Sequence, residues 1–266
     1  MDGRFGFGRN WKHYSKLIDP TRLGKAELHL KDRFNVENLN GNFLDVGSGS
    51  GVFSAAALNL GANVKAFDYD VNSVETTKKV LSLFGKEKNN WDVARGDILT
   101  SAHNLDISQS DYIYSWGVLH HTGNMNLAIE NIASNAPVGA RWVIAIYNDL
   151  GKESENWTKL KKLYVDFIVL RPFLIAYSYY RFWAKQQFHS LIHFRNPFIS
   201  WKNYTIDSRG MSAWYDLVDW AGGYPFEVAT PDWVVSKIEP FGWKVQQIWR
   251  NEGIGNNEFL FIKTSK

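Results

Sequence analysis

Three glycines at alternate positions follow a short apolar segment of this 266-residue chain. In the stretch FLDVGSGSG, a predicted strand ends at Gly47, and Gly49 and Gly51 follow it. Asp45 precedes the first of these glycines by two residues. Glycine permits a tight turn and lets backbone N–H groups approach a ligand closely. The spacing differs from the G-x-G-x-x-G of dinucleotide-binding loops. A carboxylate is also unfavourable beside a pyrophosphate, whereas it suits a cationic or amino-bearing ligand. A simple tight turn would need the same glycines.

Acidic residues also end the next two predicted strands. Asp68 is followed by Tyr69, and Asp97 follows Gly96. A carboxylate can accept hydrogen bonds from both ribose hydroxyls or from an exocyclic amine, and an aromatic ring can lie on adenine. Each acid alone could equally cap a helix or lie in a solvated loop. Ligands of open parallel sheets bind at the carboxyl ends of strands, so acids and glycines at three such ends predict a binding site there.

The elements that must position these residues alternate between strands and helices. Strands are predicted at 43–47, 63–70, 91–97, 110–117 and 140–148, and helices at 52–61, 72–85 and 125–136. The second helix is expected to begin near Asn72 or Ser73. The third is expected to bury its apolar side. The side chains of that side are Leu127, Ile129, Ile132 and Ala133.

The alternation is interrupted after Tyr147 and returns near the C-terminus. A helix is predicted at 231–242 and strands at 243–250 and 257–265, joined by the short link NEGIGN. So short a link cannot hold a crossover helix, so these two strands must be antiparallel. We therefore predict an α/β fold with a Rossmann-like, doubly wound seven-stranded sheet whose last strand is antiparallel. Residues 1–42 form an N-terminal arm or lid, 43–149 the core, 150–231 an inserted helical, aromatic cap, and 232–266 the remainder of the core.

The motifs LDVGSGSG, AFDYD, ARGDIL and DYIYSWGVLHHTGN resemble those of class I S-adenosylmethionine-dependent methyltransferases. The resemblance covers 43–148 and, by architecture, 232–265. It implies that S-adenosyl-L-methionine is the cofactor, and that Asp45 and the glycines suit its sulfonium. The cofactor-binding residues it implies are Asp45, Gly47, Ser48, Gly49, Gly51, Asp68, Tyr69, Asp97, Ile98 and Trp116. Trp11, with Arg4 or Arg9, is expected to contact the cofactor if the N-terminal segment folds over it. An arm packed on the edge of the sheet is the alternative.

Two adjacent histidines, His120 and His121, follow the fourth predicted strand. Imidazole titrates near neutral pH, so both are candidate catalytic bases for a hydroxyl acceptor. Each could instead cap or pack the following helix. The loop lacks the Asn/Asp-Pro-Pro-aromatic motif of base N-methyltransferases. Nucleic acid is therefore not the expected substrate, and the net charge of +3 agrees with this.

The segment between Lys159 and Tyr204 has eight Lys or Arg, one acid (Asp166) and many aromatic residues. Amphipathic helices would place the aromatic residues on one side and the basic residues on the other. Such helices could form an ordinary cap, dimerise, or lie on an anionic membrane surface. The candidate substrate-binding residues lie in or beside the cap. They are Tyr147, Arg209, Trp214, Asp216, Asp219, Tyr224 and Glu227. Asn256, Asn257 and Glu258 are expected near the same opening.

The composition limits the remaining classes of function. The chain has no cysteine, and we find no metal-ligand spacing. The N-terminus lacks the apolar region of a signal peptide, and no apolar run approaches about 18 residues, so we expect a cytoplasmic protein with peripheral membrane contact as an option. The chain also resembles methyltransferases described as quinone-methylase-like. We predict O-methylation of a small molecule such as a sugar, a phenolic or quinol ring, or a lipid-linked compound. An RNA or N-methyltransferase, an NAD-dependent oxidoreductase and a non-catalytic cofactor-binding protein are the alternatives.

Overall fold

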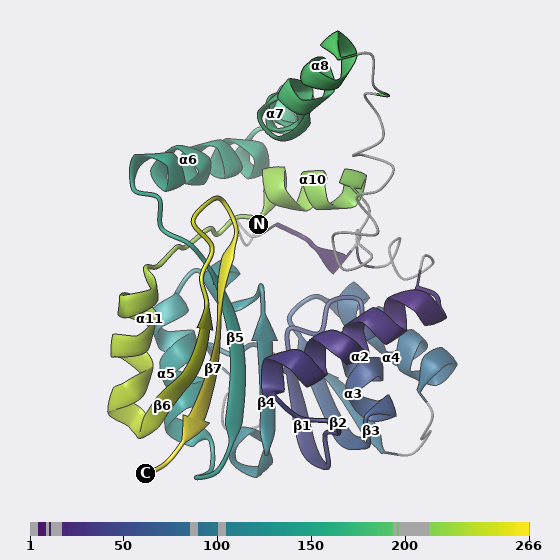
Figure 1. Ribbon diagram of the computed structural model, residues 1–266, viewed down its shortest axis with the longest axis vertical. Coiled ribbons are helices and arrows are strands. Elements are labelled where there is room, and N and C mark those ends of the chain that lie inside the picture. The colour runs from purple at the N-terminus through teal and green to yellow at the C-terminus, as the bar shows by residue number, and fades with distance from the viewer. Residues whose placement is uncertain are drawn as a thin grey trace.

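Seven strands form one sheet in the order β3-β2-β1-β4-β5-β7-β6 (Figure 1). β7 pairs antiparallel with both β5 and β6, and the other neighbours are parallel. The strands are β1 (Gly41–Val46), β2 (Ala62–Asp68), β3 (Trp91–Arg95), β4 (Tyr112–Trp116), β5 (Arg141–Tyr147), β6 (Trp243–Trp249) and β7 (Asn256–Lys263). The predicted seven-stranded sheet with a reversed last strand is confirmed. The computed structural model describes residues 5–8, 11, 18–85, 90–100, 105–193, 196 and 213–265.

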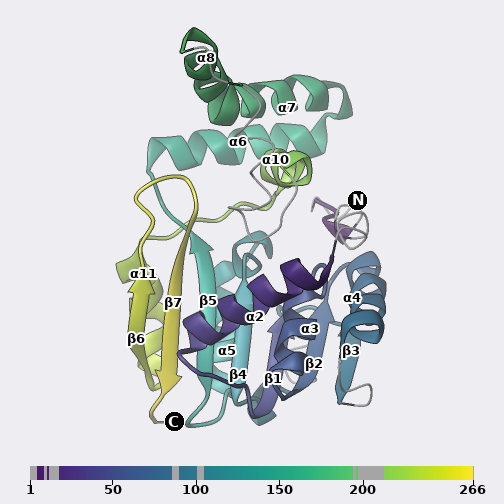
Figure 2. The same ribbon diagram turned by 45° about the vertical axis from the view of Figure 1, so that its right-hand side comes forward.

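Helices cover both faces of the sheet (Figures 1 and 2). On one face lie α2 (Pro20–Phe34), α3 (Val52–Asn59) and α4 (Val71–Phe84). On the other lie α5 (Met125–Asn135) and α11 (Pro231–Ile238), with the short turns η3 (Ile107–Gln109), η4 (Leu119–His121) and η7 (Glu239–Phe241). β5 is central and buries five consecutive residues, which fits a strand covered on both faces.

The expected start of the second helix is confirmed, because α4 begins at Val71, next to Asn72. Its cap is Asp70, whose side chain accepts a hydrogen bond from the Asn72 N–H. In α5, Met125 and Ala128 are buried with Ile129, Ile132 and Ala133, whereas Leu127 is only half-buried. The buried side of α5 therefore includes Met125 and Ala128, which were not expected, and has Leu127 at its edge.

The inserted cap lies beyond the carboxyl ends of the parallel strands (Figure 1). Its helices are α6 (Lys152–Asp166), η5 (Ile168–Leu170), α7 (Arg171–Tyr179), the π-helical η6 (Tyr180–Ala184), α8 (Lys185–Ile192) and α10 (Ala213–Gly222). The sequence had suggested that the aromatic residues would lie together on one side of the cap helices. The structure instead divides them between the interior and the surface of the cap. Trp157, Tyr164 and Trp183 are buried, whereas Phe173 and Phe188 are exposed. None of the helices that the structure describes is long and apolar enough to cross a membrane.

Candidate active site

A cavity of about 1190 Å³ separates the carboxyl ends of the central strands from the cap. Most of the residues predicted for the site line it. These are Trp11, Asp45, Gly47, Ser48, Gly49, Asp68, Tyr69, Asp97, Ile98, Trp116, His121, Tyr147, Asp216 and Asp219. Gly51, His120, Trp214, Tyr224 and Glu227 are not part of the lining, and Arg4, Arg9 and Arg209 lie outside the described residues.

The glycine loop after β1 is shaped by close packing. Gly51 has φ +77°, and a Cβ there would lie 2.6 Å from the Thr77 Cα, so this glycine lets the loop approach α4. Ser48 bonds the Thr77 hydroxyl at 2.9 Å. A Cβ on Gly49 would lie 3.2 Å from the Trp11 ring, which therefore approaches the loop closely. The loop thus forms the floor of the cavity, and Trp11 forms part of its wall.

The N-terminal segment closes the same side of the cavity. Phe5 and Phe7 line it. The Phe5 N–H donates to the Tyr224 carbonyl at 2.8 Å, and the Gly8 N–H donates to the Asp70 carboxylate at 3.0 Å. The segment therefore bridges the start of α4 and the loop after α10, across the opening.

Asp68 is held rigidly at the end of β2. One carboxylate oxygen accepts the Gly49 N–H and the other accepts the Asp70 N–H, both at 2.9 Å. Burial raises the pKa of Asp68 to about 6, and these hydrogen bonds partly offset that effect. Each oxygen keeps a lone pair for a further donor, which is the arrangement that a pair of ribose hydroxyls requires.

Tyr69 and Ile98 supply apolar walls beside Asp68. Tyr69 is 40% exposed, and its ring lies 5.6 Å from the guanidinium carbon of Arg95. Ile98 is buried in the core between the sheet and the helices α5 and α11. Asp97 accepts the Leu99 N–H at 2.9 Å, which fixes its carboxylate at the end of β3. A flat heterocycle with an amino group matches these walls and this acceptor.

Asp45 lies deeper in the cavity, only 3% exposed. Its carboxylate accepts the Ser54 hydroxyl at 2.5 Å. Burial, together with the nearby Asp68 carboxylate, raises its pKa to about 7, although the Ser54 hydrogen bond opposes this shift. A ligand with positive charge would favour the ionised form, so Asp45 is suited to sense such a ligand.

The raised pKa of Asp45 predicts that Asp45→Asn stabilises the ligand-free protein at pH 8. Because the folded-state pKa exceeds the unfolded value of about 4, the folded form holds the extra proton between about pH 4 and 7, and stability falls as pH rises through this range. Asparagine avoids the buried charge, so we expect a gain on the order of 2 kcal/mol at pH 8, shrinking toward pH 4. Urea unfolding at several pH values measures it. A variant less stable than the wild type at pH 8 would contradict the assignment.

His121 lies in η4, at the cavity wall. Its Nδ1 donates to the Pro225 carbonyl at 2.6 Å, so Nε2 carries the lone pair. Burial lowers the pKa of His121 to about 3, although the Pro225 hydrogen bond opposes this. The ring packs 5.0 Å from that of Phe7. His121 is thus a neutral acceptor in a fixed tautomer.

His120 has a different environment. It is fully buried, its ring lies 4.2 Å from that of Tyr147, and neither ring nitrogen has a hydrogen-bond partner among the residues that the structure describes. Burial holds its pKa well below the usual value. Of the two candidate bases, the structure places only His121 at the cavity.

Lys161 of α6 was not anticipated from the sequence. It is fully buried, its ammonium lies 4.1 Å from the centre of the Trp220 ring, and it donates to the Trp220 carbonyl. Burial lowers its pKa to about 7, and Asp219 and Asp216 act in the opposite direction. Lys161 therefore ties α6 to α10, the helix that presents both acids to the cavity.

Three of the candidate substrate-binding residues lie outside the cavity lining: Glu227, Tyr224 and Trp214. The Glu227 carboxylate accepts the Met125 N–H at 3.0 Å, so it stabilises the start of α5. The backbone carbonyl of Tyr224 accepts a hydrogen bond from the Phe5 N–H, and the Trp214 side chain is half exposed.

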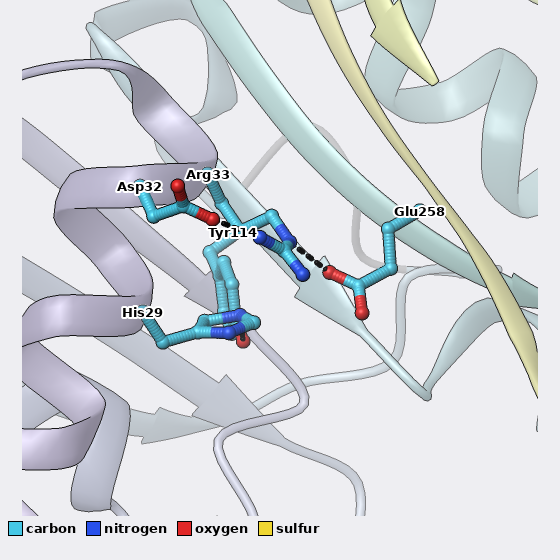
Figure 3. A network of polar contacts seen from close by, with 5 residues as sticks. All are labelled: His29, Asp32, Arg33, Tyr114 and Glu258. Atoms are coloured by element: carbon cyan, nitrogen blue, oxygen red, sulfur yellow. Dashed lines mark hydrogen bonds and ion pairs between the residues drawn. The ribbon is translucent and has the colours of Figure 1, made fainter. Parts of the chain in front are cut away.

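The wall formed by β4 and β7 is tied to α2 (Figure 3). Glu258, which lines the cavity, accepts Arg33 Nε at 2.5 Å, and Arg33 also lies over the Trp249 ring at 4.4 Å. Tyr114, another lining residue, hydrogen-bonds with His29 at 3.2 Å. Asn256 lines the cavity too, whereas Asn257 is buried and donates to Asn148. The described residues contain no group of three or more His, Asp or Glu that could hold a metal ion.

Comparison with known families decides the class of this site. A family model described as a methyltransferase domain matches residues 21–195, well over half of the chain. The chain belongs to this methyltransferase family. It is a class I S-adenosylmethionine-dependent methyltransferase, and S-adenosylmethionine is its cofactor. The glycine cradle, the doubly held Asp68 carboxylate and the Tyr69–Ile98 walls fit that cofactor.

Solved structures share the fold of this methyltransferase at low sequence identity. The magnesium protoporphyrin IX methyltransferase of Synechocystis PCC 6803, solved with bound S-adenosylhomocysteine, is 12% identical with a TM-score of 0.52, over 95% of this chain and 84% of that one. A SAM-dependent methyltransferase from Aquifex aeolicus is 14% identical with a TM-score of 0.52, over 95% and 98%.

Mitomycin 7-O-methyltransferase is 12% identical with a TM-score of 0.52, over 92% of this chain and 54% of that one. The methyltransferase spans about half the length of several such structures. No curated protein sequence matches it.

Proposed function

We propose that this methyltransferase moves the methyl group of S-adenosylmethionine to a hydroxyl oxygen of a small molecule. The observation that carries the proposal is the orientation of His121. Its Nδ1–H is engaged by the Pro225 carbonyl, and the ring lines the cavity with Nε2 as its acceptor. A hydroxyl group needs such a proton acceptor when it attacks, whereas most neutral amine nucleophiles attack before they lose a proton.

The cofactor occupies the part of the cavity around the glycine loop in this proposal. Bound S-adenosylmethionine supplies a methyl group activated by a positively charged sulfur. Asp68 accepts the ribose hydroxyls, Asp97 faces the adenine amine, and Tyr69 and Ile98 flank the ring. The charge of Asp45 favours a cationic ligand, and Trp11 covers Gly49 from the other side.

The acceptor occupies the part of the cavity toward the cap. Tyr147, Trp220, Phe182 and Trp183 line this region together with Asp216 and Asp219. Aromatic walls favour a flat ring or an apolar chain, and the two carboxylates can accept hydrogen bonds from further hydroxyl groups. These residues support a phenolic or quinol ring, a sugar, or a lipid-linked compound as the acceptor.

His121 acts as the base in this scheme. Nε2 takes the hydroxyl proton while the new oxygen–carbon bond forms and the carbon–sulfur bond breaks, leaving the demethylated cofactor. The low pKa of His121 keeps it neutral before the reaction and also makes it a weak base, so the proton transfer depends on its position against the hydroxyl. Positioning of the two reactants supplies much of the remaining acceleration. An O-methyltransferase is among the proteins that share the fold.

Binding and turnover together test the proposal. Calorimetry should show binding of S-adenosylmethionine and S-adenosylhomocysteine and none of NAD. Release of S-adenosylhomocysteine is then followed with catechols, quinols and sugars, each paired with an analogue in which an amine replaces the hydroxyl. Turnover of the hydroxyl members, with an O-methyl product identified by NMR, is expected. Preferential turnover of the amines or of RNA would contradict O-methylation, and binding of NAD alone would contradict the interpretation of the glycine loop.

A further inference from the structure

The cap exposes apolar side chains that are not part of the cavity lining. We call these the outer apolar face. It comprises Ile168, Val169, Phe173, Tyr180, Phe188 and Leu191, each at least 56% exposed. Phe173 and Tyr180 are seven residues apart on the continuous α7–η6 helix, and Phe188 and Leu191 are three apart on α8, so each pair shares one side of its helix. Helices that expose apolar side chains on one side in this way are typical of an interaction surface.

The outer apolar face lies on helices that stand apart from the sheet. In Figures 1 and 2, α7 and α8 form one end of the long axis of the molecule, on the far side of α6 from the strands. A broad, flat partner can therefore approach α7 and α8 without meeting the sheet domain.

Charge decides which partner fits. Residues 167–193, which include η5, α7, η6 and α8, contain Arg171, Arg181 and Lys185 and no Asp or Glu. Arg181 pairs with Glu153 of α6, and the excess remains positive after that acid is counted. A second copy of the chain would bring two basic segments together, whereas the headgroups of acidic phospholipids complement them. Phe, Leu and Ile insert at the acyl boundary, and Tyr suits the headgroup level.

We propose that the cap docks on an anionic membrane surface through the outer apolar face. The π-helical turn η6 connects this face to the cavity, because Tyr180 is exposed on it while Phe182 and Trp183 line the cavity. Docking would therefore place the acceptor side of the cavity within one helical turn of the lipid. The inference does not depend on which atom of the acceptor is methylated.

Sedimentation of the full chain with lipid vesicles tests the inference. The wild type is expected to bind mixed phosphatidylcholine–phosphatidylserine vesicles and to bind pure phosphatidylcholine less. Phe173→Glu/Phe188→Glu should reduce binding to the mixed vesicles by about tenfold or more. The matched control is Leu28→Glu/Leu83→Glu, which alters apolar residues of similar exposure, 67% and 64%, on α2 and α4. It should bind like the wild type, and both variants should keep the wild-type affinity for S-adenosylmethionine.

Three results would overturn the proposal. One is equal binding of the wild type to both kinds of vesicle, or binding to neither. Another is equal loss in the cap variant and the control, which would indicate a general charge effect. The last is a wild-type dimer in sedimentation velocity that Phe173→Glu/Phe188→Glu converts to a monomer without any change in vesicle binding. That result would assign the outer apolar face to contact between copies of the chain.

Discussion

Asp68→Ala is expected to weaken S-adenosylmethionine binding by about a hundredfold or more at pH 8. Each hydrogen bond from a ribose hydroxyl to an ionised carboxylate contributes about 1.5–3 kcal/mol, and the variant loses two. It also removes the acceptors of the Gly49 and Asp70 N–H groups, so the loop loses part of its order. Calorimetry, or the fluorescence of the tryptophans around the cavity, measures the affinity.

The pH dependence of binding distinguishes the carboxylate from a purely structural role. Because the pKa of Asp68 is raised to about 6, the wild type should lose affinity as the pH falls below that value, approaching tenfold per unit. Asp68→Asn keeps the shape and cannot ionise, so its affinity should be weak and should lack the loss below about pH 6, leaving only the pH dependence that Asp45 causes near pH 7. Asp45→Asn is the control for the titration of Asp45 itself. This variant keeps the Asp68 carboxylate, so it should still lose affinity for S-adenosylmethionine as the pH falls below about 6. Wild-type affinity with an unchanged pH profile in Asp68→Asn would refute the role of Asp68.

The sheet could be predicted because its signals are local. Apolar runs end at glycine or an acid, and the six-residue link NEGIGN forces an antiparallel pair. The insertion of β7 between β5 and β6 was not predicted, since it depends on which edge of the sheet β6 and β7 join. The capping of α4 by Asp70 was missed for a related reason. Asp, Asn and Ser are all good caps, and only the backbone conformation selects among them.

The cofactor half of the candidate site was also predictable from local sequence. Strand ends place Asp45, Asp68 and Asp97 at one edge of a parallel sheet whatever the rest of the chain does. The helix of residues 20–34 and the approach of Phe5 and Phe7 to the cavity were not predicted. Their positions depend on contacts between segments far apart in the sequence, such as Phe5 with Tyr224.

The acceptor half was less predictable, because side-chain direction in the cap depends on tertiary packing. Glu227 was a candidate for substrate contact, but its carboxylate lies at the start of α5. Lys161 looked like one more solvated lysine of a basic segment, but it is fully buried against Trp220. The adjacent His120 and His121 are equivalent in sequence, and only the fold turns one toward the cavity and the other into the interior.

His121→Ala is expected to lower kcat by about 10²–10⁴-fold on a hydroxyl acceptor, because the variant lacks the group that takes the proton. The affinity for S-adenosylmethionine should stay nearly unchanged, since that affinity is assigned to the glycine loop, Asp68 and Asp97. The wild-type kcat should also lack an inflection near pH 6.5, because burial lowers the pKa of His121 to about 3. Stopped assays of S-adenosylhomocysteine release, at saturating cofactor and across pH, measure both effects.

His120→Leu provides the matched control for the base. The side chain is fully buried with no hydrogen-bond partner among the described residues, so an apolar residue of similar size should keep kcat within a few-fold. If His120→Leu loses as much turnover as His121→Ala while remaining folded, the geometry around Pro225 does not select the base. If His121→Ala instead loses cofactor binding as severely as Asp68→Ala, the histidine is part of the cofactor pocket, and proton transfer must be assigned to another group on the cavity wall.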